Sequence, residues 1–226
     1  MKSRIPPLSR LFPLILLAIL LAFYAVAAKA TDGAVTAKPN NPDLVSTMPD
    51  NLPKATFAGG CFWCLESEFR KQPGVVYTVS GYAGGHVEHP SYEQVSQGRT
   101  GHAEALEIYY DPTKTNYQTL LDHFLRRAHD PTTKDAQWVD HGSQYRSAIF
   151  YHDEAQKKIA EDTIARINAE KIYKNPIVTE VTAAPTFWPA EDYHQQYYEK
   201  YEGRTGQAHV RVIAKEKMKS EKYGTK

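Results

Sequence analysis

The stretch KATFAGGCFWCLESEF, residues 54–69, contains both cysteines of this 226-residue chain, Cys61 and Cys64. It opens with small, β-branched and aromatic residues and reaches the pair Gly59-Gly60, a pattern typical of a strand that breaks into a turn. Apolar residues then recur at helical spacing, which predicts a helix that begins at or just before Cys61. These apolar residues are Phe62, Leu65 and Phe69. The stretch therefore predicts a strand, a sharp turn and a helix, with Cys61 where the turn meets the helix.

The rest of the chain continues to alternate short strands with helices. Strands are expected at 75–82, 104–110, 145–152 and 177–183, and helices at 117–128, 154–172 (capped by Asp153) and 190–201. Residues 84–101 are rich in glycine and histidine, and we expect a functional loop without regular structure there. This order predicts an α+β fold, a two-layer sandwich of helices on a mixed sheet in a ferredoxin-like arrangement with extended loops.

The first 30 residues carry the features of an export signal. Positive residues precede an apolar run at 11–28, and Ala28-Lys29-Ala30 has the form of a signal-peptidase site. We expect a signal peptide cleaved after Ala30, with an uncleaved membrane anchor formed by residues 11–28 as the alternative. Both interpretations place the rest of the chain outside the cytoplasm, either periplasmic or secreted, or anchored to the outer face of the inner membrane.

Composition divides the remaining chain into three parts. Residues 31–53 are rich in Pro, Asn, Asp and Thr and are expected to form a flexible leader, 54–204 one folded domain, and 205–226 a charged, solvated tail. The 27 basic and 26 acidic residues give a formal net charge of +1. This balance argues against a nucleic-acid-binding surface. We expect the protein to be a monomer.

The two cysteines have two structural interpretations and one chemical one. A structural disulfide is usual in exported proteins, but closing so short a loop gains only about 2 kcal/mol from chain entropy. A metal site is disfavoured because the sequence has neither a second cysteine pair nor a close histidine pair of zinc spacing. The chemical interpretation is a reactive thiol at Cys61, where the free N–H groups of a helix N-terminus favour the thiolate, with Cys64 one turn further on as a resolving thiol.

A Cys-x-x-Cys motif by itself leaves two enzyme classes open. One is a thioredoxin-like disulfide exchanger, and the other is an enzyme that attacks a different electrophile and resolves through the neighbouring thiol. The bulky pair Phe62-Trp63 between the cysteines indicates a small apolar pocket beside the nucleophile. This pair favours the second class.

GGCFWCLE at residues 59–66 resembles the active-site signature of the methionine sulfoxide reductase A family. Six further blocks resemble the same family in the same order, so the likeness extends from about residue 54 to about residue 204. They are HPSYEQV (89–95), GRTGHAEA (98–105), YDP (110–112), HDPT (129–132), DHGSQYRS (140–147) and AEDYHQQY (190–197). Ordered blocks of this kind are far more specific than the cysteine motif alone.

The resemblance implies a role for each matching residue around the reacting sulfur. Cys61 matches the nucleophile, which attacks the sulfur of methionine sulfoxide. Phe62 and Trp63 match the pocket for the methyl group of the substrate. Glu104 matches the general acid that protonates the sulfoxide oxygen. The sequence pattern alone treats Glu104 as an exposed strand residue.

Other matching residues are implied to bind and orient the sulfoxide oxygen. Tyr92 and Tyr145 match the two phenols that donate hydrogen bonds to this oxygen. Asp140 matches an acidic residue that arranges the site through hydrogen bonds. His194 lies in the last block, and we interpret it as a histidine with a structural hydrogen-bonding role.

The resemblance also implies a catalytic cycle that needs no bound cofactor. Cys61 becomes a sulfenic acid, Cys64 condenses with it to a disulfide, and a thioredoxin-like dithiol restores both thiols. Substrates would be the S epimer of methionine sulfoxide, free or in oxidised proteins. Many relatives carry resolving cysteines in a C-terminal tail, but this sequence has no third cysteine. Outside the cytoplasm, the reductant would be a dedicated membrane-linked donor.

Two other functions are weighed against this one. An extracytoplasmic dithiol/disulfide oxidoreductase explains the cysteine pair and the export signal but leaves GHAEA and DHGSQYRS unexplained. A noncatalytic module that binds methionine sulfoxide requires Cys61 to be inert.

Overall fold

The structure, a computed structural model, describes residues 51–208. The predicted signal peptide or anchor, the leader up to residue 50, and the tail from residue 209 lie outside the described residues. Within 51–208, no helix is long and apolar enough to cross a membrane.

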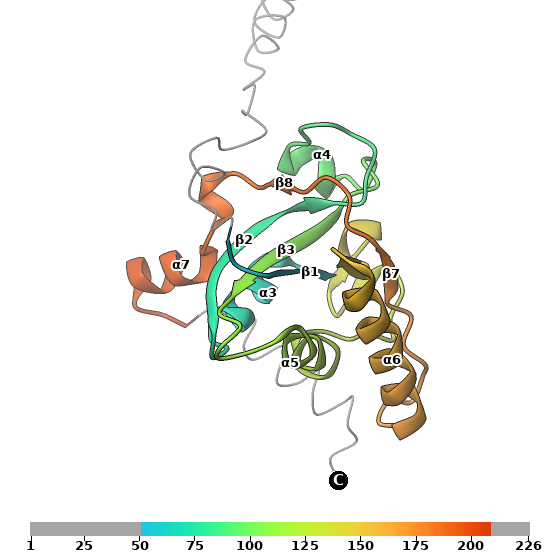
Figure 1. The fold of residues 1–226 in the computed structure, drawn as a ribbon. Helices are drawn as coiled ribbons and strands as arrows, with labels where there is room; N and C mark the ends of the chain where they lie inside the picture. Colours follow the sequence, from blue (N-terminus) through green and yellow to red (C-terminus); the bar gives the residue numbers. More distant parts are fainter. Residues whose placement is uncertain (1–50, 209–226) are drawn as a thin grey trace, which may run out of the picture. The chain divides into compact units, whose positions relative to one another are not determined.

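A six-stranded mixed sheet forms the centre of the fold, in the order β7-β6-β1-β3-β2-β8 (Figure 1). Strands β6 and β7 pair in parallel, and every other neighbouring pair is antiparallel. The strands are β1 (Lys54–Gly59), β2 (Val75–Ala83), β3 (Ala103–Tyr110), β6 (Ser147–Tyr151), β7 (Glu180–Ala183) and β8 (Trp188–Pro189). A separate small hairpin pairs β4 (Ala136–Gln137) with β5 (Asp140–His141).

The helices complete a ferredoxin-like unit. They are α3 (Phe62–Phe69), α4 (Tyr92–Ser96), α5 (Tyr117–His123) with the π-helical turn η2 (Phe124–Ala128), α6 (Glu154–Glu170) and α7 (Tyr197–Thr205). The unit β1-α3-β2-β3-α5-β6 places its four strands in the spatial order fourth, first, third, second, which is the split β-α-β pattern. The predicted α+β fold is therefore confirmed.

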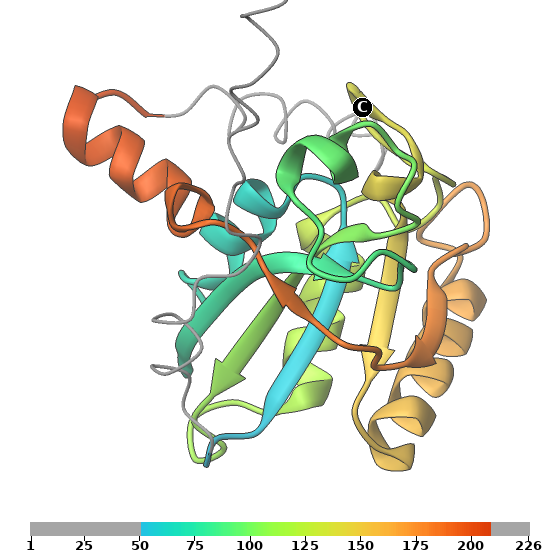
Figure 2. The same cartoon turned by 90° about the horizontal axis from the view of Figure 1, so that it is seen from above.

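The main hydrophobic core lies between the sheet and three helices. It joins side chains of β1, β3 and β6 to those of α3, α5 and α6, and Figure 2 shows α6 running beside β6 and β7. Phe57 of β1 is at its centre, with its ring stacked on Phe124 at 4.6 Å between centroids. This core fixes α3, and with it Cys61, against the middle of the sheet.

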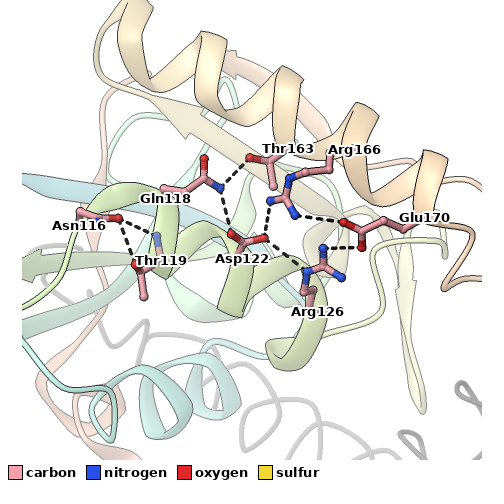
Figure 3. A network of polar contacts seen from close by, with 8 residues as sticks. All are labelled: Asn116, Gln118, Thr119, Asp122, Arg126, Thr163, Arg166 and Glu170. Carbon is pink, nitrogen blue, oxygen red and sulfur yellow. Dashed lines mark hydrogen bonds and ion pairs between the residues drawn. The ribbon is translucent and has the colours of Figure 1, made fainter.

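Charged side chains join α5 and η2 to α6 on the surface (Figure 3). Asp122 accepts hydrogen bonds from Arg166 at 2.8 Å and from Arg126 at 3.4 Å. Glu170 accepts from the same two arginines, at 3.2 Å and 2.6 Å. Gln118 extends the network by donating to Thr163 of α6 at 2.8 Å and to Asp122. Such a network stabilises more than isolated exposed ion pairs, because each side chain is held by two partners.

The prediction that residues 84–101 lack regular structure is wrong, because α4 lies within them. Ser91 caps this helix by accepting from the N–H of Gln94, and the side chain of Gln94 accepts from the N–H of Ser91 at 2.9 Å. This reciprocal pair is a capping box, and the letters SYEQ are its signature. The short helix was hidden because its neighbours are glycine, proline and histidine.

The prediction of one continuous helix at 190–201 is also wrong. A 3-10 turn, η4 (Asp192–His194), is followed by α7, and Gln196 between them is left-handed with φ of 52°. Buried Glu66 accepts from the N–H of Gln196 at 2.6 Å, and the Gln195 amide accepts from the N–H of Ser80 at 2.9 Å. These hydrogen bonds to α3 and β2 hold Gln196 in a left-handed conformation that interrupts a right-handed helix.

Smaller differences concern the ends of elements. The predicted strand at 145–152 begins only at Ser147, because a 3-10 turn, η3 (Ser143–Tyr145), precedes it. The last turn of the predicted helix at 117–128 is π-helical, and the strand at 177–183 begins at Glu180. The cap of α6 is confirmed, since Asp153 accepts from the N–H of Gln156 at 2.7 Å.

Candidate active site

Cys61 is the N-cap residue of α3, directly after the glycine turn. Its carbonyl accepts the first helical hydrogen bonds, from the N–H groups of Cys64 and Leu65, while its side chain is 8% exposed. Gly60 has φ of +86°, and a Cβ there would lie 2.7 Å from Cγ of Gln137. Position 60 therefore requires glycine for two reasons: the backbone angle is positive, and any Cβ would clash with the side chain of Gln137.

Glu104 is the second residue of β3 and is connected directly to α3. Its Oε2 accepts from the backbone N–H of Phe62, the first residue of the helix, at 2.9 Å. The side chain is 2% exposed, so the expectation of an exposed strand residue from the pattern alone is wrong. All eight residues of β3 are buried, because the strand has neighbours on both sides and is covered on both faces. A carboxyl group is thus held next to Cys61.

The two predicted phenols converge on the same place from different elements. Burial, with smaller contributions from the nearby Glu104 and Cys61, raises the pKa of Tyr92 to about 12. Burial also raises the pKa of Tyr145 above its usual range, with added effects from Glu104, Asp140, Tyr92 and Cys61. Both phenols therefore stay protonated near neutral pH and can donate hydrogen bonds. Both phenols therefore lie within electrostatic reach of Cys61, Glu104 and Asp140, so the five predicted residues gather in one place.

Aromatic rings form one wall of the site. Phe62 is fully buried, and its ring lies 6.4 Å from that of Tyr92 in a stacked arrangement. Trp63 is half-buried and stacks on Tyr197 of α7 at 3.9 Å between centroids. The wall thus combines two rings of α3 with one each from α4 and α7.

His194 fixes the position of Trp63. The indole Nε1–H donates to Nδ1 of His194 at 3.0 Å. Burial lowers the pKa of His194 to about 4, so the ring is neutral near pH 7 and carries its proton on Nε2. Nε2 is buried without a hydrogen-bond partner and lies 3.8 Å from Oε2 of Glu191. His194 has the hydrogen-bonding role that the sequence led us to expect.

Glu191 is a site residue that the sequence reasoning missed. Its Oε2 accepts from the phenol of Tyr82 on β2 at 2.9 Å, and its Oε1 accepts from the N–H of Tyr92 at 3.0 Å. The carboxylate therefore anchors the start of α4, and with it the Tyr92 phenol, to the sheet. The block AEDYHQQY contains Glu191, so the family resemblance was the signal that could have identified it.

Cys64 faces α7. The structure has both cysteines as thiols, and the Cys64 sulfur lies 3.7 Å from the hydroxyl of Tyr198. Tyr198 and Tyr197 are missed residues too, because nothing in the sequence pattern shows that α7 packs against α3. Within 51–208, no group of three or more histidine, cysteine, aspartate or glutamate side chains could hold a metal ion.

Comparisons with known proteins agree with one another. The family model described as peptide methionine sulfoxide reductase matches residues 53–226. The chain is 49% identical over 158 residues to the peptide methionine sulfoxide reductase MsrA of Listeria monocytogenes, covering 68% of this chain and 89% of that protein. It is 48% identical over 159 residues to the MsrA/MsrB protein of Vibrio cholerae, covering 70% of this chain but 42% of that protein. The solved methionine sulfoxide reductase A of Corynebacterium diphtheriae is similar with a TM-score of 0.59 and 35% identity, over 67% of this chain and 76% of that chain.

Proposed function

This chain belongs to the peptide methionine sulfoxide reductase family, and we propose that it reduces the S epimer of methionine sulfoxide, free or in oxidised proteins, to methionine. The observation that carries this proposal is the hydrogen bond from the N–H of Phe62 to Glu104. It places a buried carboxyl group beside the thiol of Cys61 and the ring of Phe62, so nucleophile, acid and apolar pocket occur together.

The first step transfers one oxygen atom from the substrate to the enzyme. The Cys61 thiolate attacks the sulfoxide sulfur while Glu104 donates a proton to the sulfoxide oxygen, which makes this oxygen a better leaving group. The oxygen ends on Cys61 as a sulfenic acid, and the substrate leaves as a thioether. The sulfur of Cys61 loses two electrons, and the sulfur of the substrate gains the same two.

Orientation of the substrate comes from the remaining site residues. The phenols of Tyr92 and Tyr145 stay protonated, and they donate to the sulfoxide oxygen. Asp140 lies within electrostatic reach of both phenols. The rings of Phe62 and Trp63 hold the methyl group, and the Trp63 indole cannot rotate freely because its N–H donates a hydrogen bond to His194.

The cycle closes through the second cysteine. Cys64 attacks the sulfenic acid of Cys61, water leaves, and a disulfide forms. A thioredoxin-like dithiol then reduces this disulfide. Support for this role comes from the sequence, which has no other cysteine, and from the location of Cys64 one turn after Cys61.

The proposed location is outside the cytoplasm, based on the positive residues, apolar run and small-residue site in the first 30 residues. A membrane-linked thioredoxin-like protein is then the reductant, because no thiol pool is guaranteed there. Sequencing the N-terminus of the mature protein from a membrane fraction and a soluble extracytoplasmic fraction tests this. A first residue at Thr31 supports cleavage, and an intact N-terminus in the membrane fraction supports the anchor.

Reduction of a chiral sulfoxide tests the activity. With the full chain and dithiothreitol, we expect the S enantiomer of methyl p-tolyl sulfoxide to be consumed and the R enantiomer to remain. Cys61→Ser should abolish the reaction, and activity close to the wild type in this variant would exclude the mechanism. A scrambled disulfide substrate serves as the parallel assay, because faster turnover there would favour a disulfide oxidoreductase, a class that does not account for the buried Glu104.

A further inference from the structure

We infer that Trp138, Val139 and Tyr193 form a binding surface at the mouth of the site for the apolar residues that flank a methionine sulfoxide in an extended polypeptide. We call these three residues the rim. The inference rests on the proposed function and goes beyond it, because it assigns residues that select a polypeptide substrate over the free amino acid.

Exposure and location together distinguish the rim. The exposed large hydrophobic side chains within 51–208 are Val76, Trp138, Val139, Val178 and Tyr193. The exposed fractions in the rim are 38% for Trp138, 64% for Val139 and 54% for Tyr193. Single exposed hydrophobic residues are ordinary on protein surfaces. The rim differs because Val139 directly precedes Asp140 and Tyr193 directly precedes His194, both of which belong to the site.

The hairpin that carries Trp138 and Val139 is fixed to the turn before Cys61. The two residues are its two-residue loop, since Gln137 pairs with Asp140. The Gln137 side chain accepts from the N–H of Asp130 at 2.9 Å and donates to the carbonyl of the same residue at 2.6 Å. It also fills the space beside Gly60. The hairpin therefore presents its loop next to the catalytic turn.

The backbone at Trp138 is unusual for a tryptophan. Its φ is 55°, in the left-handed region that two-residue hairpin loops normally fill with asparagine, aspartate or glycine. A bulky residue is rare in this region and strained there. Strain of this kind concentrates at binding and catalytic sites, where a side chain must be presented in one direction. The loop thus retains an exposed indole where a small polar residue would fit better.

Tyr193 is connected to the site through His194 and not through the hairpin. Its ring lies 4.1 Å from that of His194, and the His194 ring lies 4.4 Å from that of Tyr92. Tyr193 is thus linked to Tyr92 through one ring, while the hairpin is linked to Cys61 through Gly60. Apolar surface therefore borders both the nucleophile and the phenol that would bind the sulfoxide oxygen.

The chemistry of the substrate explains why such surface is useful. Methionine belongs mostly to apolar segments, and its oxidation disrupts the packing that buries those segments. A segment opened in this way exposes apolar side chains close to the sulfoxide. In an extended chain they follow at about 3.3 Å per residue, so they reach the border of a site that holds the sulfoxide itself. Free methionine sulfoxide has no such neighbours and gains nothing from the rim.

Paired substrates test the inference in the full chain. The rim variant is Trp138→Asn with Val139→Ser, because asparagine tolerates the backbone angle at position 138. The control variant, Val76→Ser with Val178→Ser, removes two exposed valines elsewhere. The substrates are free methionine S-sulfoxide, a peptide with the sulfoxide between leucines, and the same peptide with serines.

The expected result is a loss of selectivity. In the rim variant, kcat/KM for the leucine peptide should fall by about tenfold through a higher KM, since a tenfold change needs only a small loss of apolar contact. The ratio of kcat/KM for the leucine peptide to that for the free amino acid should fall equally. Val139→Ser and Tyr193→Ser alone should each give part of this loss, so the test does not depend on the folding of one variant.

Three results would overturn the inference. They are unchanged kcat/KM values in the rim variant, an equal fall for all three substrates that leaves the ratio unchanged, and the same fall of the ratio in the control variant. Failure of the proposed function is separate, because the wild-type protein would then not reduce free methionine S-sulfoxide at all.

Discussion

The backbone N–H of Phe62 donates to Oε2 of Glu104 across 2.9 Å, so the first residue of α3 and the start of β3 meet beside the catalytic thiol. The bond orients the carboxyl group through the backbone, which leaves no rotational freedom to the donor. It also gives a buried acidic side chain a hydrogen-bond partner at the positive end of a helix. The acid is therefore held in place before any substrate binds.

Replacing Glu104 by glutamine should separate proton donation from structure. The glutamine oxygen can still accept from Phe62, so the thermal unfolding temperature should stay close to that of the wild type. Turnover of the S sulfoxide should fall by roughly 100-fold or more, since general acid catalysis typically contributes this much. Stopped-flow or discontinuous assays of kcat measure it. A kcat within a few-fold of the wild type would mean that another group protonates the oxygen.

Replacing Cys64 by serine should uncouple repair from recycling. One equivalent of methionine per enzyme should form in a single turnover, because Cys61 and Glu104 are unchanged. Multiple turnovers with thioredoxin as the sole reductant should be lost, and dimedone should label a sulfenic acid on Cys61 that the wild type does not accumulate. Many turnovers in this variant would exclude Cys64 as the resolving thiol.

Gly60→Ala should destabilise the protein and displace Cys61. The position has φ of +86°, and the new Cβ would lie 2.7 Å from Gln137. We expect a loss of about 2 kcal/mol or more in the free energy of unfolding. Gly203→Ala is the matched control, since nothing lies within 4 Å of its added Cβ and the residue is in α7. It should stabilise by about 0.5 to 1 kcal/mol. Urea unfolding of both variants gives the comparison, and equal stabilities would contradict it.

Glu66→Gln should change how stability depends on pH. Burial raises the pKa of this carboxyl group to about 7, although hydrogen bonds from Gln196 and Thr78 lower it. The folded state therefore binds more protons than the unfolded state between about pH 4.5 and 7, so this group makes stability fall as pH rises through that window. Relative to the wild type, the variant should gain on the order of 3 kcal/mol between pH 4 and pH 8. A stability difference that stays constant with pH would contradict the raised pKa.

His194→Phe should change how the free energy of unfolding depends on pH below about 6.5. Burial lowers the pKa of His194 to about 4, so between about pH 4 and 6.5 the unfolded state binds more protons, and this residue makes stability fall as pH falls. The variant should lose that dependence. It should also raise KM for the sulfoxide at pH 7, because the Trp63 indole loses its acceptor. An unchanged KM would show that stacking on Tyr197 alone holds the indole.

Much of the fold follows from local patterns. The glycine turn, the position of Cys61 at the start of α3, the Asp153 cap of α6 and the four main strands could all be predicted from neighbours in the chain. Their order also predicts the ferredoxin-like unit, since few topologies bury one apolar face of each element. Resemblance to a family then singled out Glu104, Tyr92, Tyr145 and Asp140, which no periodicity distinguishes from surface residues.

Other features could not be predicted because their partners are far away in the sequence. The break at Gln196 depends on Glu66, and the position of Tyr92 depends on Glu191. Local preference for helix at 190–201 is weak beside several buried hydrogen bonds, so tertiary contacts decided the backbone there.

The sequence by itself therefore determined which elements form, where the thiol lies on its helix and, through family resemblance, which chemistry to expect. Only the tertiary structure decided that Glu104 is buried, that His194 holds Trp63, and that exposed apolar residues adjoin the site. The physical reason is that periodicity reports which face of an element is apolar, but not which other element covers it. Burial, hydrogen-bond partners and pKa all depend on that second fact.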